Sequence, residues 1–178
     1  DLNIQWNSLS ELRNLEGEIK FLIKDLESKA SLPDSAFLRA LRIFNLNLKK
    51  MKSLEFWSEM KDEASTFGKT DTDAYVFLNA YIDPFETLGS ALSFKLSKDL
   101  ACDENQEGFS QDYLFQELNK TFADEEILSG VIKDLLAVKK RDPAATGFLM
   151  TLLFSKGFLA LQSHRAASNF MISKKTFM

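Results

Sequence analysis

Residues 134–165 read DLLAVKKRDPAATGFLMTLLFSKGFLALQSHR, and this stretch decides the fold. Its first part continues a helix of about residues 124–140, because apolar residues recur at helical spacing: Ile127, Val131, Leu135 and Val138. Pro143 disfavours helix at the residue before it, so Arg141-Asp142-Pro143 ends this helix. A last helix is expected from about residue 145 to residue 172. The stretch therefore predicts two helices joined by a turn that carries Asp142.

The same pattern continues upstream. Residues 8–30 predict one helix with a heptad-like seam of Leu12, Leu15, Ile19, Leu22 and Leu26. The seam is explained either by packing on its own domain, or by docking on another chain or pairing with the next helix. Ser31-Leu32-Pro33-Asp34 stops this helix and caps a second one, which runs to about residue 51 with Phe37, Leu41, Phe44 and Leu48 on one stripe.

Further helices are expected at residues 54–67, 73–81, 83–100 and 110–122. Gly89, Ser90 and Ala91 in the third of these allow a neighbouring backbone to come close. With only seven Gly and three Pro, the chain is suited to long helices with short connections. We expect an all-α bundle of seven or eight helices, with residues 1–52 as an N-terminal helical hairpin extension and residues 53–178 as the main domain.

Composition excludes several classes of partner and site. The net charge of −4, with scattered basic residues, gives no face for nucleic acid, and the longest uncharged apolar stretch is too short to span a bilayer. His164 and Cys102 are single, so neither a catalytic triad, a metal site nor a cofactor site is expected. Pigment or ligand binding through His164 is a minor alternative. The sixteen Phe residues are explained either by the core or by contact with a partner.

Four segments resemble the N-terminal helical domain of serine acetyltransferases. Residues 56–64 (FWSEMKDEA) are similar to its opening helix, and residues 88–100 (LGSALSFKLSKDL) to its L-x-x-A-L-x-x-x-L-x-x-K-L helix. Residues 134–144 resemble D-x-x-A-V-x-x-R-D-P-A, and residues 152–165 resemble K-G-F-x-A-L-Q-A-[YH]-R with its flank. The last two segments are specific, and the resemblance covers about residues 55–171.

The resemblance implies a helical domain that assembles trimers into hexamers and leads into a catalytic left-handed β-helix. It also implies that Asp142 reaches into the serine pocket. The family continues R-[IV]-A-H where this chain has Arg165-Ala166-Ala167-Ser168, so its His is replaced by Ser168. No hexapeptide repeat occurs within residues 1–178. The chain as given is therefore expected not to acetylate serine.

Two functions follow as hypotheses. The preferred one is a non-catalytic scaffold or linker that holds subunits of a larger complex together, such as a photosystem–antenna assembly, peripheral to the membrane. Its expected location is an organelle, in particular a plastid, or the cytoplasm, and not outside the cell. The candidate interface is formed by Leu12, Leu15, Ile19, Leu22, Leu26, Phe37, Phe44 and Trp57. The alternative is the oligomerisation and serine-pocket domain of a serine acetyltransferase, with a trimer or hexamer as the assembly.

Overall fold

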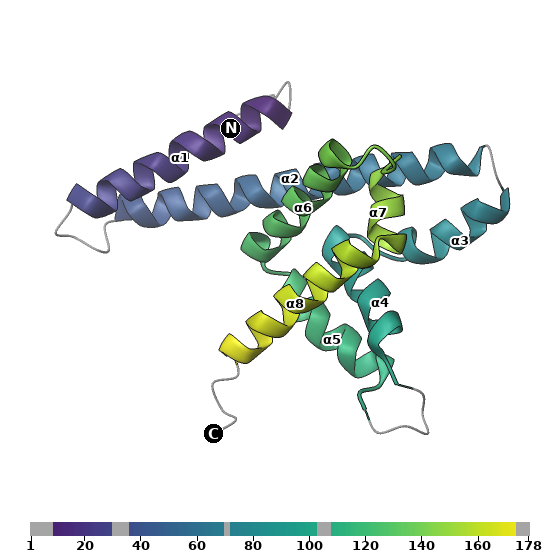
Figure 1. Cartoon of the computed structure of the whole chain (residues 1–178). Coiled ribbons are helices and arrows are strands. Elements are labelled where there is room, and N and C mark those ends of the chain that lie inside the picture. The colour runs from purple at the N-terminus through teal and green to yellow at the C-terminus, as the bar shows by residue number, and fades with distance from the viewer. Residues whose placement is uncertain (1–8, 30–35, 70–71, 103–107, 174–178) are drawn as a thin grey trace. The chain divides into compact units, whose positions relative to one another are not determined.

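The computed structural model describes residues 9–29, 36–69, 72–102 and 108–173 (Figure 1). These residues form eight helices and no strand, so the prediction of an all-α fold with seven or eight helices is confirmed. The helices are α1 (Leu9–Lys29), α2 (Ala36–Gly68), α3 (Thr72–Ile82), α4 (Leu88–Leu100), α5 (Gln111–Phe122), α6 (Glu125–Arg141), α7 (Phe148–Phe154) and α8 (Lys156–Ser173). None of them, within the described ranges, is both long and apolar enough to cross a membrane.

The chain divides into two compact units, Asp1–Lys52 and Ser53–Met178, with the division inside α2. The sequence predicted two helices here, ending near residue 51 and beginning at residue 54, and this prediction is wrong. Lys52-Ser53-Leu54 contains neither Gly nor Pro. Ser53 does not cap a new helix, since its hydroxyl donates to Oε2 of Glu125 at 3.1 Å. The expected stop and cap at residues 31–34 lie outside the described residues.

The first unit has a small apolar core. Ile19 of α1 and Leu48 of α2 are buried against each other, and Leu15, Ile23 and Leu41 pack around them. Beside this core, the carboxylate of Glu16 pairs with Lys20 at 2.7 Å and with Lys52 at 2.5 Å. Leu15 and Ile19 of the predicted seam are therefore used in packing α1 on α2.

Glu16 makes the stability of this unit depend on pH. Burial raises the pKa of Glu16, but hydrogen bonds and charge from Lys20 and Lys52 outweigh it and lower the pKa from 4.5 to about 2. Because the folded pKa is lowered, the stabilisation is fully present above the unfolded value and is lost as the pH falls through the folded one. We expect the unfolding midpoint of the whole chain to exceed that of Glu16→Gln at neutral pH, measured by circular dichroism. The difference should shrink below about pH 4.5 and vanish near about pH 2. A difference that is equal at all pH values would contradict this role.

The start of α4 differs from the expected helix of residues 83–100. The helix begins at Leu88, where the hydroxyl of Thr87 accepts the backbone N–H of Ser90 at 3.2 Å. Before it, Phe85 donates its N–H to the carbonyl of Ile82, and its own carbonyl accepts the indole N–H of Trp57 at 3.2 Å. The backbone of Phe85 is thus held by one local and one tertiary hydrogen bond. Pro84 lies in the turn that precedes the helix.

The last expected helix is divided into α7 and α8. Ser155 between them has an extended backbone (φ −75°, ψ 101°). Its N–H donates to the carbonyl of Thr151 and closes α7, while its carbonyl accepts the N–H of Leu159 and opens α8. Its hydroxyl accepts the N–H of Phe158 at 3.4 Å. Ser155 is therefore the C-cap of α7 and the N-cap of α8 at once. Serine is one of the residue types preferred at an N-cap.

The second unit is built around one apolar core that draws residues from α2 to α8. Of the Phe residues, Phe56, Phe122, Phe148 and Phe158 are buried in it. A cluster of partly buried rings lies at its edge, with Phe94 at 5.1 Å from Phe85 and 6.4 Å from Phe115. Phe21, Phe44, Phe109 and Phe154 are exposed. Most of the Phe surplus in the second unit is thus explained by its core.

Gly89 lets α4 and α5 lie side by side (Figure 1). A Cβ at this position would lie 2.6 Å from the backbone oxygen of Phe122, so the predicted close approach is confirmed. We expect Gly89→Ala to lower the free energy of unfolding by about 1–2 kcal/mol, because overpacking exceeds the gain in helix propensity. Gly157→Ala is the matched control, since a Cβ there meets nothing within 4 Å. Urea unfolding of both variants checks this, and equal stability would show that the contact relaxes without cost.

Candidate functional site

The candidate site begins at Asp142, the residue that ends α6. Its backbone is extended (φ −103°, ψ 108°), as Pro143 requires, and its N–H still donates to the carbonyl of Val138 at 2.8 Å. One carboxylate oxygen accepts the N–H of Ala144 at 2.9 Å, which fixes the direction of this exposed side chain. Asp142 therefore stabilises the turn at Pro143 and still presents a carboxylate to solvent.

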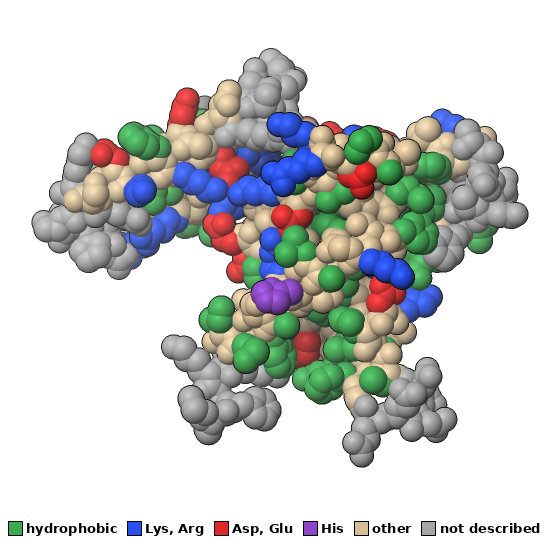
Figure 2. All heavy atoms as spheres, in the orientation of Figure 1, with side chains coloured by type: hydrophobic (Ala, Val, Ile, Leu, Met, Phe, Trp, Pro, Cys, Tyr) green, Lys and Arg blue, Asp and Glu red, His purple; other side chains and the backbone are tan. Residues whose placement is uncertain are grey.

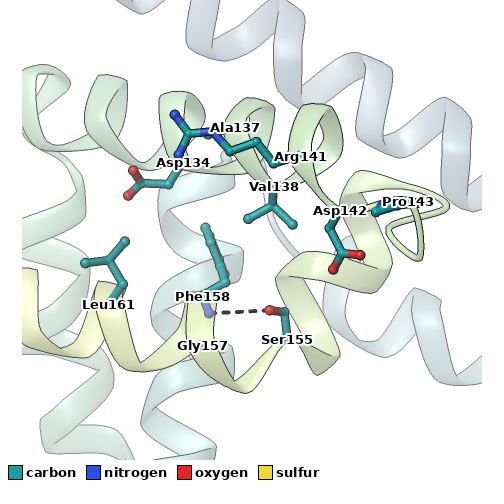
Figure 3. A pocket seen from close by; sticks show the side chains of 10 residues that line it. All are labelled: Asp134, Ala137, Val138, Arg141, Asp142, Pro143, Ser155, Gly157, Phe158 and Leu161. Atoms are coloured by element: carbon teal, nitrogen blue, oxygen red, sulfur yellow. Dashed lines mark hydrogen bonds between the residues drawn. The ribbon is translucent and has the colours of Figure 1, made fainter.

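A pocket of about 490 Å³ lies between the end of α6 and the start of α8. Figure 3 shows Asp142 on one side of it and Phe158 and Ser155 on the other, with Asp134 further along α6. The complete lining is Asp134, Ala137, Val138, Arg141, Asp142, Pro143, Ser155, Gly157, Phe158 and Leu161. We call it the α6–α8 pocket. Its wall is largely apolar, with charged groups at Asp134, Arg141 and Asp142.

A polar cluster joins the two helices that form this pocket. Oδ2 of Asp134 accepts hydrogen bonds from Arg165 at 2.7 Å and from the amide of Gln162 at 3.0 Å. Arg165 also donates to the amide oxygen of Gln162, which is fully buried. This cluster was not predicted from the sequence. Its signal was the spacing of Gln162 and Arg165, which places both on one face of a helix.

The start of α7 depends on Glu63 of α2. Its two carboxylate oxygens accept the backbone N–H groups of Phe148 at 3.0 Å and Leu149 at 3.2 Å, so Glu63 caps α7 from another helix. The N-cap residue of α7 is Gly147, which has no side chain to do this. A Cβ on Gly147 would collide with the Glu63 carboxylate. Sequence reasoning did not find this cap, because the partners lie 85 residues apart.

The structure places the predicted interface residues in different environments. Trp57 is a correction, because its side chain is only 2% exposed and its indole N–H is bonded inside the second unit. Ile19 is buried and Leu15 is half-buried in the core of the first unit. Leu22 and Phe44 are exposed. The side chains of Leu12, Leu26 and Phe37 lie outside those that the structure describes.

The one histidine and the one cysteine of the chain are both exposed. His164 lies on the surface of α8 and is the purple side chain in Figure 2. Cys102 is a free thiol after α4. Across the described residues, no three His, Cys, Asp or Glu side chains come together as metal ligands. Ser168, which replaces the expected His, is half-buried on α8.

Comparison with known proteins identifies relatives of the second unit. Residues 56–163 match the family model described as "Serine acetyltransferase, N-terminal". A probable serine acetyltransferase 5 of Oryza sativa subsp. japonica is 32% identical over 111 residues, which are 62% of this chain and 32% of the rice protein. The serine acetyltransferase of Escherichia coli strain K12 is 33% identical over 114 residues, or 61% of this chain and 39% of that protein. The chain thus spans less than half the length of these relatives.

Solved structures agree in fold with the second unit. A soybean serine acetyltransferase complexed with serine has a TM-score of 0.60 at 28% identity, over 68% of this chain and 49% of the soybean chain. A serine acetyltransferase of Neisseria gonorrhoeae in complex with serine has a TM-score of 0.59 at 28% identity, over 67% of this chain and 48% of that one. The resemblance in residues 55–171 that the sequence predicted is confirmed.

Proposed function

The chain belongs to the serine acetyltransferase family, and we propose that it serves as the oligomerisation and serine-pocket domain of such an enzyme. The part of the family that it matches is the N-terminal helical domain. The family match and the relatives favour this function over the scaffold that the sequence alone suggested. Its activity as an enzyme requires catalytic groups in addition to those of residues 56–163. We place those groups in the β-helix that the family resemblance implies.

The α6–α8 pocket is the observation that carries the proposal. Asp142 stands at its rim with a carboxylate whose direction is fixed by Ala144. A carboxylate in this position accepts hydrogen bonds from an ammonium or hydroxyl group, and both groups occur in serine. Arg141 also lines the pocket, and its side chain points back along α6 toward Asp134 in Figure 3. The Asp142 carboxylate thus matches the ammonium and hydroxyl groups of an amino acid such as serine.

The experiment is an assay of the protein as isolated from its source. It measures the serine-dependent release of coenzyme A from acetyl-CoA, and its dependence on Asp142. Acetyl transfer that is lost or weakened by substitution of Asp142 supports the proposal. A native protein with no such activity contradicts it.

A non-catalytic linker is a second candidate function, and the replacement of the expected His by Ser168 favours it. The exposed apolar residues of the first unit favour it as well. Stable co-purification of a defined second subunit with an inactive native protein would select the linker over the enzyme. Assembly with a photosystem–antenna complex and location in a plastid stay predictions.

A further inference from the structure

Three polar side chains tie α8 to α6. Oδ2 of Asp134 on α6 accepts hydrogen bonds from Arg165 at 2.7 Å and from Gln162 at 3.0 Å, and both donors belong to α8. Arg165 also donates to the amide oxygen of Gln162, so each of the three side chains is bonded to the other two. The cluster is therefore closed, and it joins the two helices that form the α6–α8 pocket.

The arrangement of this cluster permits little adjustment. Gln162 is 0% exposed, and both polar atoms of its amide are bonded inside the cluster. A shift of α8 along α6 would leave this buried amide without its partners, which costs free energy. A Cβ on Gly130 would lie 3.3 Å from Cζ of Arg165, so the absence of a side chain at this position leaves room for the guanidinium against α6. The place of Arg165 is thus specified from both helices.

The cluster and Asp142 lie toward opposite ends of the pocket. Figure 3 shows Asp134 and Leu161 toward one end, and Asp142 and Ser155 toward the other. Asp134 and Asp142 are eight residues apart, which is about 12 Å along a helix. A pocket between two helices removes part of the packing that would hold them at a fixed distance. The contacts at its ends therefore determine its width.

We propose that Arg165 is a positioning residue for the serine site. Through Asp134 and Gln162, it fixes α8 against α6. This sets the distance between the Asp142 carboxylate and the wall that α8 contributes. Arg165 is not among the residues that line the pocket, so it acts on the substrate only through the geometry of the two helices. The inference rests on the proposed function, because it concerns the same site.

The first test measures the distance between the two helices in the full chain and needs no activity. In a Cys102→Ser background, Lys140→Cys and Ala160→Cys place nitroxide labels at exposed positions of α6 and α8. Double electron–electron resonance should give a narrow distance distribution for this chain and a broader one after Arg165→Gln. A distribution of the same mean and width in both would overturn the inference.

Three variants show whether the effect belongs to this cluster. Arg165→Lys keeps the charge and should broaden the distribution less than Arg165→Gln does. Asp134→Asn weakens the same pair from α6 and should broaden it as well, which keeps the inference testable if Arg165→Gln does not fold. Lys95→Gln is the matched control, because it removes a 2.6 Å ion pair that stays within α4, and it should change nothing. Circular dichroism confirms that each variant keeps its helices. Equal broadening by Lys95→Gln would contradict the role of Arg165.

The second test is the steady-state kinetics of the native protein and of its Arg165→Gln variant. The KM for serine should rise by about tenfold while the KM for acetyl-CoA stays unchanged, because only the serine side of the site is displaced. Partial unfolding alone would lower the amount of active enzyme and leave both KM values as they were. An unchanged KM for serine, or an equal rise in both KM values, would overturn the inference.

The two tests separate failure of this inference from failure of the proposed function. A native protein without serine-dependent release of coenzyme A contradicts the proposed function and removes the role of Arg165 toward serine. The resonance measurement then still decides whether Arg165 fixes α8. An active protein in which Asp142→Asn raises the KM for serine and Arg165→Gln does not would overturn this inference alone.

Discussion

Replacement of Glu63 by alanine should lower the free energy of unfolding by about 3 kcal/mol. Glu63 accepts the N–H groups of Phe148 and Leu149, and both of these residues are buried. Without the carboxylate, two partly buried backbone donors lose their acceptor, and the start of α7 loses its negative charge. Urea unfolding followed by circular dichroism measures this loss.

Two variants define the origin of the effect. Glu59→Ala removes an exposed carboxylate one turn earlier on α2 and should change stability by less than about 0.5 kcal/mol. Glu63→Gln keeps one acceptor oxygen and should fall between Glu63→Ala and the unchanged chain. If Glu63→Ala is as stable as Glu59→Ala, the cap of α7 contributes nothing. Under that result, the collision of a Cβ at position 147 with the Glu63 carboxylate would no longer explain why this position is glycine.

Replacement of Asp142 by asparagine should raise the KM for serine by about ten- to a hundredfold in the protein isolated from its source. The substitution keeps the shape of the side chain and removes the negative charge that faces the α6–α8 pocket. The charge-assisted hydrogen bond to serine that the proposed function implies then becomes a weaker neutral one. Because this contact is made in both the bound substrate and the transition state, kcat should change less than KM. Steady-state kinetics with serine as the varied substrate measures both parameters.

Asp112→Asn is the matched control for Asp142→Asn. Asp112 is also an exposed aspartate at a helix end, in the first turn of α5, and it does not line the pocket. Its kinetics should equal those of the unchanged protein. An active protein in which Asp142→Asn leaves KM unaltered would limit Asp142 to the turn that it forms with Ala144. Loss of kcat alone would assign it to the chemical step.

Much of the second unit could be predicted from local patterns. The helices α5 and α6 begin after Ser110 and Asp124, whose side chains accept backbone N–H groups, and α6 ends before Pro143. These signals act over three or four residues, so a sequence displays them directly. The close approach at Gly89 was predictable for the same reason, because a residue without a side chain occurs on an apolar helix face.

The predictions that failed depended on distant residues. The sequence predicted a break between residues 51 and 54, but α2 continues through it, and the hydroxyl of Ser53 bonds to Glu125, 72 residues away. Trp57 looked like an interface residue, but its indole bonds to the carbonyl of Phe85 in the core. In both cases the partner of the side chain lies far away in the sequence.

The sequence by itself determined the helical class, most helix boundaries, the family and the position of Asp142 at the end of a helix. Periodicity, capping residues and proline express these features locally, through sterics and short-range hydrogen bonds. Only the tertiary structure decided that Glu63 caps α7, that Asp134 joins Gln162 and Arg165 beside the pocket, and that Trp57 is buried. Each of these depends on which buried polar group or apolar side chain finds a partner across the fold, and that is settled by packing of the whole domain.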